Sequence, residues 1–170
     1  GSGWGPYPGD PLPYQATSVW ADETTIYCCG DNGVVMSSHG DGWTVHDTGT
    51  LRKLTAIWGF SSEDVWVGGG EGVLLHWDGF EWEPMSWPDQ ADGSDWCHQN
   101  GLEIDGMWGT DGVLFFHTYK QLVMWNGTEF EVLAADQPVE GKVGVMPSVT
   151  RYPVRAIWAA AMIARRKCEA

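Results

Sequence analysis

The feature that most constrains the fold of this chain is an internal repeat of about forty to fifty residues. Its opening phrase occurs four times, each time around a tryptophan, at Ser18-Val19-Trp20, Ala56-Ile57-Trp58-Gly59, Gly106-Met107-Trp108-Gly109 and Ala156-Ile157-Trp158. These tryptophans are 38, 50 and 50 residues apart, and the first three copies each end in a glycine turn followed by an aromatic residue. Because repeated residues mostly pack against neighbouring copies, the pattern determines architecture far better than activity.

The second copy shows what one repeat forms. Short apolar and β-branched runs alternate with turn residues, and the four runs are Leu54–Trp58, Asp64–Val67, Val73–Trp77 and Glu81–Met85. The glycine-rich stretch 68–72 is expected to be a turn, and Asp78-Gly79 is a strong hairpin signal. Four strands joined by tight turns predict one blade of a β-propeller. No window in the repeats fits the helical period of 3.6 residues.

The fold prediction is therefore all-β across residues 18 to 133, a partial β-propeller of three four-stranded antiparallel blades with the start of a fourth. The predicted segments are a Gly/Pro-rich arm (1-17), three blades (18-54, 55-103 and 104-153), and a fourth repeat start with a basic tail (154-170). Closing a propeller takes about four to eight blades. We therefore expect further blades in a longer parent chain, or self-association in which the flank bearing Trp20 meets the flank near Trp125.

Two stretches resemble known propeller families. The residues from Val65-Trp66-Val67-Gly68 to Leu74-Leu75-His76-Trp77-Asp78-Gly79 resemble the "DVWAVG...ILHWDG...W" blades of large bacterial β-propellers, abundant in secreted proteins of myxobacteria and their relatives. The first repeat resembles a blade of the BNR/photosystem II assembly factor type, although its Asp-box is degenerate because His39 stands at the aspartate position. The resemblance covers about residues 15 to 135 and implies a secreted bacterial protein, extracellular or periplasmic.

Charge excludes one class of partner. The net charge is -14, and residues 1 to 150 hold 22 acidic residues against Arg52, Lys53, Lys120 and Lys142. Phosphate backbones are repelled by such a surface, so nucleic acid is not expected as a partner. The sequence has no apolar run of about 18 residues, so no membrane span is expected, and no signal peptide is recognisable.

The insertion between the second and third blades is the candidate binding site. It covers residues 86 to 101 and is too long for a routine connection. Loops on rigid scaffolds carry specificity, and this one gathers polar and aromatic residues that the repeat does not dictate. The predicted binding residues are Trp87, Asp92, Asp95, Trp96 and His98.

Other tempting residues have plainer explanations. The periodic tryptophans could be sugar-stacking platforms, but aromatic residues at repeat positions pack one blade on the next. Metal binding by the histidines is disfavoured because His39, His76, His98 and His117 occupy different repeat positions, and the aspartates at 89, 92 and 95 lack the regular calcium-loop spacing. Asn126-Gly127-Thr128 fits the glycosylation pattern and also a hairpin turn, which is favoured. We therefore expect no metal and no cofactor.

The cysteines decide little about redox compartment. A bridge between adjacent Cys28 and Cys29 would be strained, a pair with Cys97 is the alternative, and Cys168 lies in the tail.

Catalytic motifs are missing from the sequence. It has no Gly-x-Ser-x-Gly elbow, no His-Glu-x-x-His pair and no arginine cluster of the sialidase kind. The chain is thus expected to be a non-catalytic interaction scaffold outside the cytoplasm with a protein or glycan partner. The alternatives are a carbohydrate-binding propeller that uses exposed tryptophans and, more remotely, the accessory part of a glycosidase.

Overall fold

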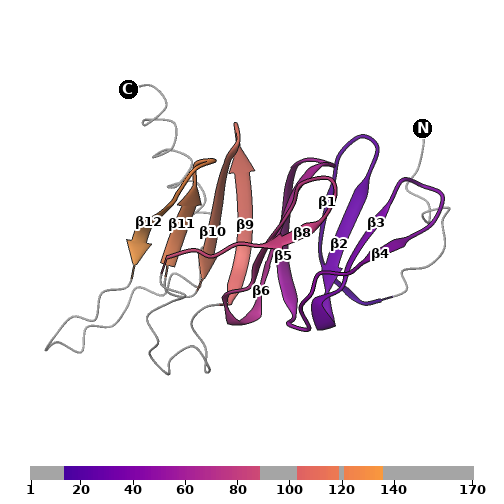
Figure 1. The fold of residues 1–170 in the computed structure, drawn as a ribbon, viewed down its shortest axis with the longest axis horizontal. Helices are drawn as coiled ribbons and strands as arrows, with labels where there is room; N and C mark the ends of the chain where they lie inside the picture. The colour runs from indigo at the N-terminus through magenta and orange to yellow at the C-terminus, as the bar shows by residue number, and fades with distance from the viewer. Residues whose placement is uncertain (1–13, 89–102, 119–120, 136–170) are drawn as a thin grey trace, which may run out of the picture.

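The computed structural model describes residues 14–88, 103–118 and 121–135, which form three sheets side by side (Figure 1). Each sheet has four antiparallel strands whose spatial order follows the chain order. Blade 1 consists of β1 (Ala16–Ala21), β2 (Ile26–Gly30), β3 (Val35–Ser38) and β4 (Thr44–His46). Blade 2 consists of β5 (Leu54–Ser61), β6 (Asp64–Gly69), β7 (Leu74–Trp77) and β8 (Trp82–Pro84). Blade 3 consists of β9 (Ile104–Thr110), β10 (Val113–Thr118), β11 (Gln121–Trp125) and β12 (Phe130–Ala135).

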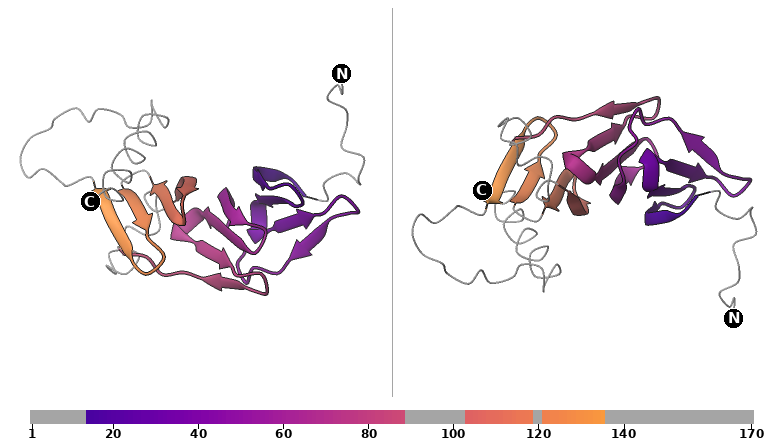
Figure 2. Two further views of the ribbon diagram at one scale, coloured as in Figure 1. Left: turned by 90° about the horizontal axis from the view of Figure 1, so that it is seen from above. Right: turned by 90° about the horizontal axis from the view of Figure 1, so that it is seen from below.

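This arrangement confirms the predicted partial β-propeller of three four-stranded blades, whereas residues 1–13 of the predicted arm and the fourth repeat start at 154–170 lie outside the described residues. The views in Figure 2 show the three blades following one another in an open row, with blade 2 in the middle. Besides strands, the described residues contain two single-turn 3-10 segments, at Asp31–Gly33 and Gly70–Gly72. The strands of blades 1 and 2 begin at Ala16 and Leu54, slightly before the predicted limits of 18 and 55. Blade boundaries beyond the described strands stay predictions.

The glycine-rich stretch 68–72 is only partly the predicted turn. Gly68 and Gly69 belong to β6, and the turn begins at Gly70. A Cβ added to Gly68 would lie 2.6 Å from Cγ2 of Ile104 in blade 3. A Cβ added to Gly69 would overlap the backbone oxygen of Lys53. Close approach of other strands, rather than a turn, therefore requires these two glycines.

Most of the hydrophobic core lies between the blades, and a smaller cluster around Phe115 and Met124 belongs to blade 3 alone. One buried cluster joins blade 1 to blade 2 and consists of Tyr27, Cys29, Val35, Leu54, Ile57, Val65, Val67, Leu75 and Trp82. A second joins blade 2 to blade 3 and consists of Ala56, Trp66, Leu74, Trp87, Ile104, Leu114, Phe116 and Val123. Successive strand residues point to opposite faces of a sheet, so blade 2 contributes one face to each junction, and blades 1 and 3 contribute one face each.

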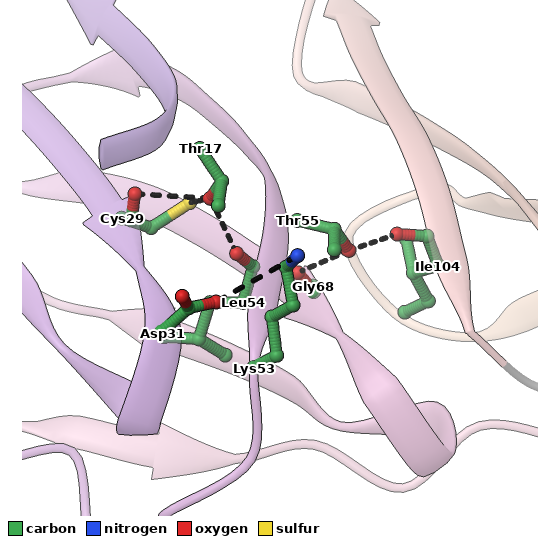
Figure 3. A network of polar contacts seen from close by, with 8 residues as sticks. All are labelled: Thr17, Cys29, Asp31, Lys53, Leu54, Thr55, Gly68 and Ile104. Carbon is green, nitrogen blue, oxygen red and sulfur yellow. Dashed lines mark hydrogen bonds and ion pairs between the residues drawn. The ribbon is translucent and has the colours of Figure 1, made fainter. Parts of the chain in front are cut away.

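The two junctions repeat the same polar and aromatic contacts. Thr17 Oγ1 donates a hydrogen bond to the Leu54 carbonyl (2.5 Å), and Thr55 Oγ1 donates one to the Ile104 carbonyl (2.6 Å), as Figure 3 shows. A Cβ added to Gly59 would lie 2.7 Å from Cζ2 of Trp20, so this tryptophan lies directly on the backbone of blade 2. Gly109 meets Trp58 in the same way, with 2.6 Å between its added Cβ and the indole nitrogen.

The positions of Trp20 and Trp125 correct one expectation. The sequence predicts both on outer flanks available for self-association, but both lie in junctions between blades. Trp20 packs against the cluster that joins blades 1 and 2, and the Trp125 ring is 5.9 Å from that of Trp66 in blade 2. The repeat pattern cannot show this, because it marks a strand position without saying which neighbouring blade the side chain faces.

Candidate functional site

A groove of about 810 Å³ runs along the outer part of the junction between blades 1 and 2. Blade 1 lines it with the end of β4 and the following loop, residues 45–50. Blade 2 lines it with Glu71, residues 73–75, Trp77, residues 80–82 and residues 84–86. The volume is in the range of protein ligand sites, about 300–1,000 Å³. Residues of two sheets and their loops therefore form most of this site, and Ser86 is the one lining residue that belongs to the 86 to 101 insertion.

The walls of the groove are aromatic and apolar. Phe80 is 89% exposed, the highest value among the large hydrophobic residues of the described chain, and Val45 is 48% exposed. Phe80 follows Asp78, whose Oδ1 accepts hydrogen bonds from the backbone N–H groups of Phe80 (2.8 Å) and Glu81 (3.0 Å). These bonds lower the pKa of Asp78, so the turn that presents Phe80 stays intact at neutral pH.

His46 lies deeper in the groove among aromatic rings. Its imidazole stands edge-on to Trp77 and Trp82, with ring centres 5.2 and 6.1 Å away. Its Nε2 atom is 2.8 Å from Ser37 Oγ. Burial lowers the pKa of His46, so the imidazole is neutral at pH 7 and adds no positive charge to the groove.

The charged side chains of the groove are mostly acidic. Asp47 comes from blade 1, and Glu71 and Glu81 come from blade 2. Glu71 forms an ion pair with Arg52, whereas Lys53 pairs with Asp31 at 3.7 Å. Arg52 and Lys53 are the only lysine or arginine residues in the described part of the chain, against 16 aspartates and glutamates. The groove therefore lies in a strongly negative region.

The predicted binding residues fall partly outside the described residues, and Trp87 is the one that the structure places. Trp87 is 3% exposed and belongs to the core between blades 2 and 3. Its indole N–H donates to the Gly72 carbonyl (3.0 Å), and its ring meets Phe116 edge-on. Trp87 is thus a packing residue in this structure, because its ring is covered. Asp92, Asp95, Trp96 and His98 lie outside the described residues, and their role stays a prediction.

The other tryptophans and histidines of the described chain pack or pair within it. None of its nine tryptophans is exposed. His76 Nε2 is 2.9 Å from Asp64 Oδ1, which also accepts from the Trp66 indole, and His39 Nδ1 is 3.1 Å from Thr25 Oγ1. Within the ranges that the structure describes, no three acidic, histidine or cysteine side chains gather as a metal site would require.

Asn126 and the cysteines also have structural roles. Asn126 Oδ1 accepts hydrogen bonds from the backbone N–H groups of Thr128 and Glu129, both at 3.0 Å, which confirms the predicted turn. Cys28 and Cys29 are buried free thiols, and burial raises the pKa of Cys29 to about 11. Cys97 and Cys168 lie outside the described residues.

Sequence reasoning missed the groove. Phe80 is the aromatic residue after the Asp78-Gly79 turn, but nothing in the repeat distinguishes an exposed aromatic at this place from a packed one. Its counterpart after Asn126-Gly127 is a threonine, so the difference between copies is the signal that could have identified it.

Comparison with known proteins supports the fold but identifies no family. No family model and no curated protein matches the chain. A solved structure described as "YCF48 bound to D1 peptide" has 17% identity and a TM-score of 0.53 over 72% of this chain and 41% of that chain. The WD40 β-propeller domain of Doa1 has 14% identity and a TM-score of 0.47 over 72% of this chain and 46% of that one. The chain thus spans less than half of each. The first likeness supports the β-propeller fold, while the BNR/Asp-box and myxobacterial assignments stay predictions.

The described residues include no helix with the length and apolar character needed to cross a membrane.

Proposed function

We propose that this chain is a non-catalytic β-propeller segment that acts as a protein-interaction scaffold outside the cytoplasm. The observation that carries the proposal is the groove between blades 1 and 2, with Phe80 89% exposed at its wall. Exposed aromatic side chains beside a groove are typical of protein-binding surfaces, where such residues contribute most of the binding energy.

A rigid frame favours this use of the groove. Its two walls belong to sheets joined by a shared buried cluster, and a groove held in this way is expected to change little when a partner binds. The first similar structure is itself that of a protein bound to a peptide. That likeness concerns the fold alone. It supports the proposal because it gives one example of a protein of similar fold bound to a peptide.

The absence of catalysis is part of the proposal. The groove contains a neutral histidine bonded to Ser37, but this histidine is packed among Trp77, Trp82 and Tyr27 rather than oriented toward a substrate. The extracytoplasmic location rests on the resemblance of the second repeat to secreted propellers. Further blades in a parent chain, or association of copies, would supply the blades that closure requires.

A selection from a random peptide display library on the immobilised full chain tests the proposal. We expect enriched peptides whose binding falls about tenfold in Phe80→Ala, because the ring loses most of its apolar contact. Val19→Ala is the control, since Val19 is also exposed (62%) but lies away from the groove. The proposal fails if no sequence family is enriched, or if enriched peptides bind both variants alike.

Carbohydrate binding is the second candidate, and a glycan array on the same protein tests it. No tryptophan of the described residues is fully exposed, which argues against open stacking platforms there, although Trp77 and Trp82 line the groove. Binding of a defined glycan, together with an empty peptide selection, would favour the carbohydrate candidate over the protein scaffold.

A further inference from the structure

We infer that the groove between blades 1 and 2 binds an extended peptide segment carrying lysine or arginine next to apolar residues. The inference rests on the proposed function and adds the chemistry of the partner. Its basis is the combination of carboxylates from both blades with an exposed aromatic wall in one groove.

Two carboxylates without a cationic partner in the described residues line the groove. Asp47 lies on the blade 1 side and Glu81 on the blade 2 side, and both residues are exposed. Asp47 Oδ1 accepts the Gly49 N–H (3.0 Å), which orients the carboxylate without neutralising it. Neither carboxylate has a cationic partner in the described part of the chain, because Arg52 and Lys53 pair with Glu71 and Asp31. A segment with positive charges meets two uncompensated carboxylates here, whereas an acidic segment is repelled.

Exposed apolar surface lies in the same groove as these carboxylates. Phe80 and Val45 expose apolar surface that the methylene stems of lysine and arginine can cover while their charged ends reach the carboxylates. The Phe80 ring face also attracts a cation directly. The groove volume of about 810 Å³ accommodates several side chains rather than one, so a peptide fits better than a single small cation.

Two matched peptides test the inference on the full chain. The probe is a fluorescein-labelled peptide in which lysine alternates with leucine and serine, and its partner has glutamate at every lysine. Fluorescence anisotropy should show saturable binding of the lysine peptide that weakens as salt is raised, and no binding of the glutamate peptide.

Two double variants with equal charge change locate the interaction. Asp47→Asn with Glu81→Gln removes both groove carboxylates, and the amide oxygen introduced at position 47 keeps an acceptor for the Gly49 N–H. We expect affinity for the lysine peptide to fall about fourfold to twenty-fivefold, because each of the two screened charge pairs contributes about twofold to fivefold. Glu23→Gln with Glu129→Gln changes exposed residues outside the groove, and we expect less than about a twofold effect.

The outcomes separate the inference from the function on which it rests. Equal loss in the two double variants would mean attraction by the whole acidic surface and would overturn the groove assignment. Equal binding of the two peptides would overturn the cationic partner. In that case a Phe80-dependent set of library peptides would still support the protein scaffold, whereas an empty selection would reject the scaffold as well.

Discussion

Replacing Thr55 by valine removes one hydroxyl from the junction between blades 2 and 3. The Thr55 hydroxyl has a single proton, and the nearer of its two acceptors is the Ile104 carbonyl at 2.6 Å rather than the Gly68 carbonyl at 3.4 Å. Valine has nearly the same shape, so the packing is kept while the donor is lost. The variant therefore isolates the hydrogen bond between blades.

The expected loss of stability depends on the Ile104 carbonyl, which the substitution leaves without its hydrogen-bond donor. A typical intramolecular hydrogen bond contributes about 0.5–1.5 kcal/mol, and a buried acceptor that loses its donor costs about 1–3 kcal/mol. Ile104 is fully buried, so water does not readily replace the hydroxyl. The higher strand propensity of valine offsets a few tenths of this. We expect Thr55→Val to lower the free energy of unfolding by about 1–2 kcal/mol.

Urea unfolding followed by tryptophan fluorescence measures this loss. With a slope of about 2 kcal/mol per molar urea, the midpoint should fall by about 0.5–1 M at unchanged slope. Thr44→Val is the matched control, because Thr44 is exposed in β4 and should change the midpoint little. An equal midpoint for the two variants would refute the claim that these threonines hold the blades together.

Three further predictions concern the junctions and the groove. Gly59→Ala should cost about 1–3 kcal/mol because its Cβ would lie 2.7 Å from the Trp20 ring, whereas Gly70→Ala, with its nearest atom at 3.6 Å, should cost less in the same urea assay. Cys28 and Cys29 should resist iodoacetamide in the folded chain and react after unfolding, since both are buried and burial raises the pKa of each thiol; mass spectrometry showing rapid modification at about pH 8 would contradict this. His46 has a pKa below its usual 6.5, so the unfolded chain binds its proton first and the contribution of His46 to stability, complete above pH 6.5, should be lost as pH falls toward the native value. His46→Gln should flatten the slope of stability between about pH 7 and 5, and an unchanged slope would show that another group is responsible.

The sequence allowed the blades to be predicted because their signals are local. Turns such as Asp78-Gly79 and Asn126-Gly127 carry their own hydrogen-bonding side chains, and the aromatic repeat marks equivalent strands. Contacts between repeats are not predictable in the same way. Thr17 and Leu54 are 37 residues apart, and nothing near either residue indicates the other. Thr55 does repeat the position of Thr17, but the third copy has Asp105 there. The repeat therefore does not mark this threonine as a contact between blades.

The binding site is harder to predict because it depends on which residues remain uncovered. The insertion after blade 2 stands out by its composition, yet its first tryptophan, Trp87, fills the core between blades 2 and 3. The groove instead combines residues of two repeats that are unremarkable in each repeat taken alone. The groove forms where the end of β4 and its loop lie opposite blade 2, and that placement follows from how the two sheets pack.

The two threonine hydrogen bonds between blades run in one direction along the chain, from the hydroxyl of the earlier blade to a carbonyl of the later one, as does the bond from the Tyr27 hydroxyl to the Ser62 carbonyl (3.0 Å). During synthesis on the ribosome, the Trp20 ring therefore stays uncovered until Gly59 has left the exit tunnel. The Thr17 hydroxyl can meanwhile donate to the Cys29 carbonyl of its own blade (3.0 Å), and it gains its bond to blade 2 only after Leu54 has emerged. In the same way, Thr55 and Trp58 of blade 2 make their contacts with blade 3 only after Ile104 and Gly109 have emerged. A growing chain of this kind presents one unfinished face at a time to chaperones, and translation speed between repeats sets how long that face stays open.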